Sequence, residues 1–357
     1  MFKSLLRYRY KTLLILISSV SAIASIFLIT ALANGIISMY AQMLRTDGDI
    51  IITQKGVADT FFSDVNRSLI ADVKNINGVK DVSGVVVGAG AIGPVPIAGI
   101  YGVTENRMKS YGLSRGSYPK RGEVMLGSAI ASTLGDVESV ELMGEWFRIS
   151  GVYRSDIGFE NGGVVIPIAD AGRIFGKDAS FLLVSLDDIS RGTEKIIERI
   201  EALSDHVQVR STTDFIESYN QFKIIRISSG VIASISFFMG FLAIVSLMSM
   251  MIHDRRYEFG IKRAVGISKS SIILQIVAEV TVLILVAFFL AYGLSLLLLE
   301  MLEHVEKFQG YLSGKIDPSL FFALLGGSVL MALVGALIPA VMAARTDPMI
   351  LINKGQA

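Results

Sequence analysis

Residues 253–270, HDRRYEFGIKRAVGISKS, form the densest mixed-charge stretch of the chain and separate its two most apolar stretches. If residues 253–265 are helical, Glu258 precedes Lys262 by four residues, the favourable order for an ion pair. Gly266 could then end this helix, and Ser268 could cap the next one. The apolar residues of the helix share one stripe: Tyr257, Ile261, Ala264 and Val265. This pattern favours a helix that contacts another protein, and the alternative is a basic loop that only fixes topology.

Two other patterns could indicate a nucleotide or catalytic site, but neither has the sequence or the flanks that such a site needs, and there is no sign of metal binding. Residues 310–317, GYLSGKID, are one residue short of a phosphate-binding loop and have Ile316 where Ser or Thr is needed. Residues 112–116 fit G-x-S-x-G, but their flanks predict a Gly-rich turn rather than a nucleophile elbow. The chain has no cysteine, and its three histidines lie far apart. We therefore expect that this chain does not bind ATP through a phosphate-binding loop, and its histidines, without any cysteine, give no signal of a metal site.

The composition indicates a membrane protein. Of 357 residues, 52% are hydrophobic and only 18% are charged, which is unusual for a soluble protein. The net charge of +1 does not suggest a nucleic-acid partner. Four stretches are long and apolar enough to cross a bilayer, and backbone satisfaction in lipid requires them to be helical.

The distribution of Lys and Arg predicts the orientation of these spans, because cytoplasmic flanks are basic. The N-terminal flank and the 253–269 loop are basic, whereas the loop after the third span is acidic. The predicted order is: 1–11 cytoplasmic, 12–39 first span, 40–226 extracytoplasmic domain, 227–252 second span, 253–269 cytoplasmic helix, 270–299 third span, 300–318 extracytoplasmic loop, 319–344 fourth span, and 345–357 cytoplasmic tail.

Glu279 is the one charged residue in the third span. An intramembrane carboxylate indicates a functional or structural role facing the bundle, and the alternative is a side chain that reaches the headgroups. A proton relay would need a second acid or a histidine within the spans, and the sequence has neither.

The region 40–226 predicts a mixed α/β domain. A β-α-β pattern occurs near each end, and two such units commonly make a four-stranded sheet covered by two helices. Residues 95–175 predict an inserted, β-rich lobe, with a hairpin turn at residues 143–145. Residues 212–232 predict one helix that continues into the second span. Four aromatic residues of the domain are expected in its core, with contact to a substrate as the alternative: Phe61, Phe62, Trp146 and Phe159.

The charged segment resembles the coupling segment of the MacB/LolC–LolE/FtsX superfamily of ABC-transporter membrane subunits, whose usual form is close to E-R-R-x-E-I-G-I-L-R-A-L-G-A-S. The matching residues are Arg255, Arg256, Glu258, Gly260, Ile261, Arg263, Ala264, Gly266 and Ser268. The departures are Asp254, Phe259, Lys262, Val265 and Ile267, of which Lys262 adds a charge.

Two further segments and the layout resemble the same superfamily. GALIPAVMAARTDPMILI is similar to its fourth-span ending at Gly335, Pro339, Ala340, Ala343, Ala344, Arg345 and Pro348. PKRGEVMLGSAIASTLG is similar to part of its external core domain, and Glu279 falls where the family often has Glu. One span, a large external domain and three further spans are also its arrangement.

The resemblance implies a non-catalytic inner-membrane permease subunit without a cofactor of its own, which works as a homodimer or paralogous heterodimer. The dimer would bind two copies of a separate ATPase that binds ATP and Mg, and the 253–265 helix, including Tyr257 and Lys262, would sit in a groove of that ATPase. The movement would be passed to the periplasmic domain for export or extraction of a substrate. An adaptor or outer-membrane channel stays open as a further partner. The alternatives are an FtsX-like regulator of a cell-wall hydrolase and a membrane-anchored sensor or scaffold without an ATPase.

Overall fold

The computed structural model describes residues 9–188, 192–303 and 314–345, which form two compact units. One unit contains the chain up to Asn34, Ile227–Glu300 and the chain from Gly314. The other is built mainly from Gly35–Arg226. The predicted fold class, four apolar helices with an α/β domain, is confirmed.

Within the described residues, four helices are long and apolar enough to cross a membrane. They are α2 (Arg9–Asp47), α10 (Asn220–Asp254), α12 (Lys269–Glu303) and α13 (Pro318–Arg345). The shortest has 28 residues, about 42 Å of helix at about 1.5 Å per residue, which exceeds a hydrocarbon core of about 30 Å. Each helix begins before and ends after the corresponding predicted span.

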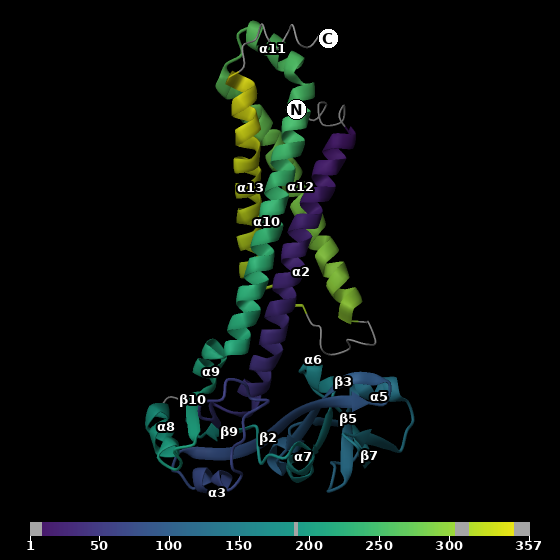
Figure 1. The fold of residues 1–357 in the computed structure, drawn as a ribbon, viewed down its shortest axis with the longest axis vertical. Helices are drawn as coiled ribbons and strands as arrows, with labels where there is room; N and C mark the ends of the chain where they lie inside the picture. The colour runs from purple at the N-terminus through teal and green to yellow at the C-terminus, as the bar shows by residue number, and fades with distance from the viewer. Residues whose placement is uncertain (1–8, 189–191, 304–313, 346–357) are drawn as a thin grey trace. The chain divides into compact units, whose positions relative to one another are not determined.

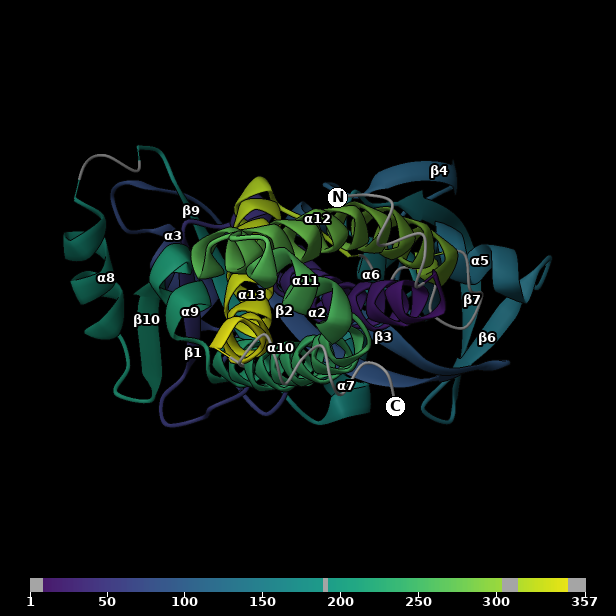
Figure 2. The ribbon, with the colours of Figure 1, turned by 90° about the horizontal axis from the view of Figure 1, so that it is seen from above.

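Helices of the first unit lie close together (Figures 1 and 2), and small residues stand at two of their contacts. A Cβ built on Gly240 of α10 would lie 2.8 Å from the Cβ of Ala22 in α2. One built on Gly335 of α13 would lie 3.0 Å from Ile244 in α10. Such close backbone approach is the usual basis of helix association in lipid, where the hydrophobic effect contributes little.

The second unit contains one ten-stranded sheet with the order β10-β1-β9-β2-β3-β8-β5-β7-β4, and β6 pairs with β7. Its strands are β1 (Ile50–Gln54), β2 (Val79–Ile92), β3 (Val95–Val103), β4 (Gly112–Gly116), β5 (Glu123–Gly127), β6 (Ser139–Leu142), β7 (Glu145–Arg154), β8 (Val164–Pro167), β9 (Phe181–Leu186) and β10 (Val207–Ser211). Its short helices are α3 (Leu69–Lys74), α4 (Glu105–Met108), α5 (Ser128–Leu134), α6 (Gly158–Asn161), α7 (Ile168–Phe175), α8 (Thr193–Glu201) and α9 (Thr212–Ser218).

The two predicted β-α-β units are present as β1-α3-β2 and β9-α8-β10. They interleave in the order β10-β1-β9-β2. The inserted residues do not form a separate sheet, because the 14-residue strand β2 pairs with β9 at one end and with β3 at the other. The prediction of two lobes is therefore wrong, because both parts share one sheet. Two hydrophobic clusters lie on one face of this sheet, one beneath the two β-α-β units and one beneath the inserted residues.

The opposite face of the sheet packs against the end of α2, α9 and the start of α10. Alternation along β2 explains this division, because Val85 and Val87 join the cluster on this face while Val86 joins a cluster on the other. Residues 212–232 are not one helix as predicted. α9 ends before Tyr219, whose ψ of 119° is extended, and α10 begins at Asn220.

Three local predictions have different outcomes. The hairpin at residues 143–145 is confirmed, since Leu142 pairs with Glu145 across Met143 and Gly144, which both have positive φ. The turn predicted at residues 112–116 is wrong, because this segment is β4, an exposed edge strand paired with β7. The core assignment of the aromatic residues is also wrong for three of them, since Phe61, Phe62 and Trp146 are exposed.

The contact between α7 and β3 predicts a steric limit at Gly102. A Cβ built there would lie 2.1 Å from the Cβ of Ala171. We expect Gly102→Val to destabilise the second unit by about 2 kcal/mol, because overpacking forces backbone shifts. Pulse proteolysis of the full chain in urea measures this, with Ala89→Val at an exposed position of β2 as the matched control. Equal stability of the two variants would contradict the packing described.

Candidate functional site

The charged segment forms a short helix with two defined ends. α10 continues through Asp254, Arg255 leaves helical geometry with φ −94° and ψ 4°, and α11 spans Arg256–Ala264. The prediction of one helix over 253–265 is therefore wrong at its start. Residues 253 and 254 are the last two residues of α10, so the break between the helices comes after them.

The end of α11 is as predicted. Gly266 has φ +98°, and its N–H donates to the carbonyl of Arg263 at 3.1 Å. The N–H of Ile267 donates to the carbonyl of Lys262 at 3.0 Å, which completes a Schellman motif. Ser268 then caps α12, because its Oγ accepts from the N–H of Ser271 at 3.2 Å.

A buried ion pair joins this segment to the third long helix. Arg255 Nη1 donates to Glu279 Oε2 at 2.6 Å, and the residues are only 2% and 0% exposed. Gln275, one turn before Glu279, donates to Glu279 Oε1 at 3.0 Å. The question that the sequence left open is settled, since Glu279 faces the helix bundle and has a structural partner.

A second carboxylate extends the network along α11. Glu258 accepts from Lys262 Nζ at 2.8 Å and from Arg255 Nε at 3.3 Å, so the predicted i,i+4 pair is present. Lys262 also reaches Gln275 Oε1 at 3.2 Å. Burial raises the pKa of Glu258, but the hydrogen bonds from Lys262 and Arg255 outweigh it and bring that pKa below its usual value. The network thus contains two bases and two acids.

The helix α11 has one face turned to the bundle and one turned to solvent. Phe259 is 1% exposed in the hydrophobic cluster of the bundle, and the Arg255 guanidinium lies 5.0 Å from its ring centroid. The predicted stripe lies on the other face, where Tyr257 and Ile261 are each 42% exposed and Val265 is 78% exposed. Ala264, the fourth member of the stripe, is also exposed.

The other predicted site residues occupy several places. Arg256 is the first residue of α11, Gly260 is buried within it, and Arg263 donates to the carbonyl of Ile267 at 3.3 Å. Pro339 lies inside α13 and Arg345 ends it. Pro348 lies outside the described residues. The sequence reasoning missed the inward role of Arg255 and the ion pair between Lys11 of α2 and Asp254 of α10.

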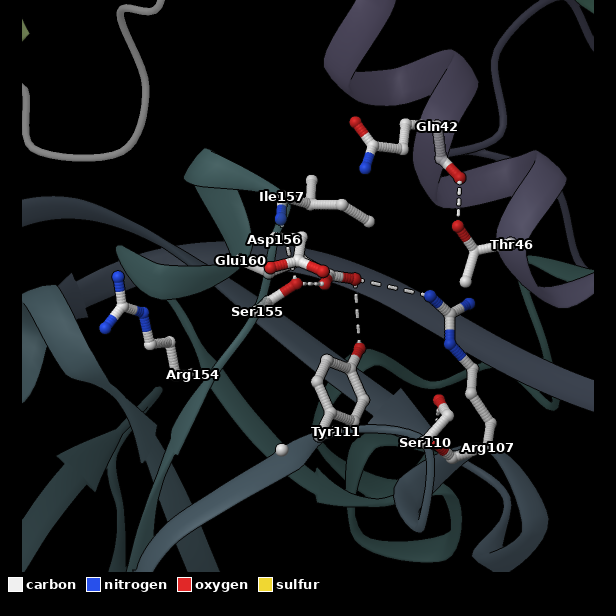
Figure 3. Close-up of a pocket in the computed structure, with 11 residues that line it drawn as sticks. Gln42, Thr46, Arg107, Ser110, Tyr111, Arg154, Ser155, Asp156, Ile157 and Glu160 are labelled. Atoms are coloured by element: carbon white, nitrogen blue, oxygen red, sulfur yellow. Dashed lines mark hydrogen bonds and ion pairs between the residues drawn. The ribbon is translucent and has the colours of Figure 1, made fainter.

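A second polar site lies in the other unit, in a pocket of about 440 Å³ (Figure 3). Its side chains converge on Glu160, which accepts from Arg107 at 3.3 Å and from the Tyr111 hydroxyl at 3.1 Å. Ser155 donates to its other oxygen at 2.5 Å. The contact between Arg107 of α4 and Glu160 of α6 holds these two short helices beside each other. Among the described residues there is no group of His and acidic side chains that could hold a metal.

Four apolar helices, a mixed α/β domain between the first and second, and a charged helix after the second define a permease-type membrane subunit. The family model for the MacB-like periplasmic core domain matches residues 12–203, and that for the FtsX-like permease C-terminal region matches residues 230–348. The first match covers more than half of the chain, so the chain belongs to this family of MacB/FtsX-type ABC-transporter permeases. The resemblance inferred from the sequence is confirmed.

Individual relatives are distant. A macrolide export ATP-binding/permease protein MacB of Hyphomonas neptunium is 28% identical over 240 residues, which is 60% of this chain and 35% of that protein. An uncharacterized ABC transporter permease of Methanocaldococcus jannaschii is 24% identical over 226 residues, 60% of this chain and 56% of that protein. The chain thus spans between about a third and just over half of these relatives. The periplasmic region of MacB from Actinobacillus actinomycetemcomitans has a TM-score of 0.40 at 12% identity, covering 49% of this chain and 94% of that chain.

The ion pair between Arg255 and Glu279 predicts a specific pattern of stabilities. Glu279→Ala should destabilise the bundle by about 3–5 kcal/mol, because it leaves a buried guanidinium without its carboxylate. Replacing both residues by Met should restore most of this loss, since no buried charge is then unpaired. Denaturant titration of the full chain in mild detergent measures both effects.

The matched control is Glu303→Ala, which removes an exposed carboxylate from the same helix. It should change stability by less than about 0.5 kcal/mol. A Glu279→Ala variant as stable as this control would show that the buried pair does not hold α11 to α12.

Proposed function

We propose that the chain is a non-catalytic permease subunit whose helix α11 docks on an ABC ATPase in the cytoplasm. ATP and Mg are bound by that ATPase, which we place on a separate chain in two copies per complex. Nucleotide-driven closure moves α11, and the permease passes this movement to its extracytoplasmic domain to export or extract a substrate. The permease itself acts as a homodimer or paralogous heterodimer in the cytoplasmic membrane, with both termini in the cytoplasm.

The observation that supports this proposal best is the division of α11 into an anchored face and an exposed face. Phe259 and Arg255 hold one side in the bundle, while Tyr257, Ile261 and Val265 leave an apolar stripe in solvent. Exposed apolar side chains flanked by charges are typical of a protein contact. The family also implies an ATPase partner.

The anchoring explains how a docked helix could transmit force. A helix between flexible loops would move without displacing the rest of the protein. In contrast, α11 is connected to α12 by the ion pair between Arg255 and Glu279 and by the tight turn at Gly266. The long helices α2 and α10 each run without interruption from the bundle into the unit that holds the sheet. The regulator alternative is not favoured, because the matched external region is the MacB-like core domain.

Ile261→Asp tests the docking face. A carboxylate on the exposed stripe should reduce recovery of the ATPase with the permease by at least about tenfold, because it places an unpaired charge in an apolar contact. The measurement is affinity purification of the tagged full chain from its native host, with mass spectrometry of the ABC-type ATPases recovered.

Val137→Asp is the matched control, because Val137 is 41% exposed and lies in the other unit. It should leave recovery of the ATPase unchanged. Equal recovery with both variants would contradict docking through this stripe. Both variants must keep the unfolding midpoint of the parent chain, which separates lost docking from lost folding.

A further inference from the structure

An apolar cavity of about 430 Å³ lies in the unit that holds the sheet, on the face covered by the long helices. Its walls come from the end of α2, strands β2 and β3, α6 and the start of α10. Six aromatic residues line it: Tyr40, Phe61, Tyr101, Phe159, Tyr219 and Phe222. Its volume is in the range of sites for drug-sized molecules.

The aromatic rings that line the cavity pack against one another. The ring of Tyr40 stacks on that of Tyr219 at 5.9 Å and 9°, and Phe222 meets both rings edge-on at 5.4 Å and 4.9 Å. The ring of Phe159 also stacks on that of Tyr40, with the two centroids 6.4 Å apart. The break between α9 and α10 gives Tyr219 the extended backbone that turns it into this cluster. The site is therefore pre-formed, which lowers the entropic cost of binding.

Asp59 is the only charged side chain among the described residues that line the cavity. Its Oδ1 accepts from the Tyr219 hydroxyl and from the N–H of Phe61, each at 2.9 Å, and its Oδ2 accepts from Gln221 at 3.0 Å. Burial raises the pKa of Tyr219 to about 12, so its phenol stays neutral at physiological pH. A carboxylate has room for about four hydrogen bonds, so Asp59 can still accept one from a ligand.

The basic residue that interacts with Asp59 through space, Lys177, does not line the cavity. Its ammonium donates to the carbonyls of Phe61 and Val87 at 2.8 Å and 3.0 Å. The lining therefore has negative charge and aromatic faces. Both attract a cation, and both disfavour an anion such as a fatty acid.

Accessible apolar side chains form the rim of the cavity. Ile97 is 69% exposed, Phe61 is 43% exposed and Ile36 is 38% exposed, and all three belong to the lining. A concave, mostly apolar surface with a few convergent polar groups, here Asp59, Tyr219 and Gln221, is the usual form of a small-molecule site.

We propose that this cavity binds an organic cation with a compact apolar body, with the charge near Asp59 and the apolar body against the aromatic walls. The inference does not rest on docking to an ATPase, since binding is measured on the permease alone. Failure of one proposal would therefore leave the other standing.

Tetraphenylphosphonium and tetraphenylborate are suitable probes, because they have nearly the same shape and opposite charge. Equilibrium dialysis of the full chain in detergent, corrected for partitioning into empty micelles, should show saturable binding of the cation. The anion should bind at least about tenfold more weakly, as expected when one nearby charge changes from attraction to repulsion. Non-saturable binding, or equal binding of the two ions, would overturn the proposal.

Two variants locate the binding site. Asp59→Asn should weaken tetraphenylphosphonium binding by about tenfold while leaving tetraphenylborate no weaker, because only the charge is removed. Asp64→Asn is the matched control, since Asp64 is exposed and does not line the cavity, and it should leave binding of both ions unchanged.

Ala89→Phe fills the cavity from an exposed position on β2 and should abolish saturable binding of both ions. Unchanged binding in this variant places the probe elsewhere and refutes the assignment. Proteolytic resistance equal to that of the parent chain shows that the domain remains folded in each variant.

Discussion

The buried contact between Arg255 and Glu279 is the constraint on which the charged segment depends. Each ion loses hydration that is worth several kcal/mol, so neither is tolerable without the other. Their separation of 2.6 Å compensates both charges at once, and Glu258 and Gln275 satisfy the remaining polar atoms. Because the two residues lie on different elements, this compensation requires the break after α10 to stay beside α12. The position of α11 is therefore fixed by electrostatics as well as by packing.

This constraint separates the charges of the segment into two kinds. Arg255 is buried in the bundle and paired with Glu279. Glu258 and Lys262 form an ion pair with each other. What α11 offers to solvent is mainly the apolar stripe of Tyr257, Ile261 and Val265. A partner would therefore recognise shape and apolar area first, with charge around the rim.

The sequence predicted best what depends on neighbours along the chain. The stop at Gly266 and the cap at Ser268 need only a few adjacent residues, and the four spans follow from length and hydropathy. The sequence-based predictions failed where a structure depends on contacts between residues that are far apart in the sequence. Arg255 and Glu279 are 24 residues apart, and the edge strand at residues 112–116 exists because β7 supplies its hydrogen bonds. Tyr219 interrupts a helical pattern because tertiary contacts to Tyr40 and Asp59 outweigh local propensity.

The aromatic cavity and the long helices are linked through shared residues. Tyr40 belongs to α2, and Phe222 and Ile225 belong to α10, so two helices that continue into the bundle also form the walls of the cavity. A ligand that stabilises the stacking of Tyr40 on Tyr219 would favour the spacing of the two helix ends at which those rings meet. By thermodynamic reciprocity, any process that changes this spacing must change the affinity of the cavity. If these helix ends move, the occupancy of a site built from them therefore changes with that movement.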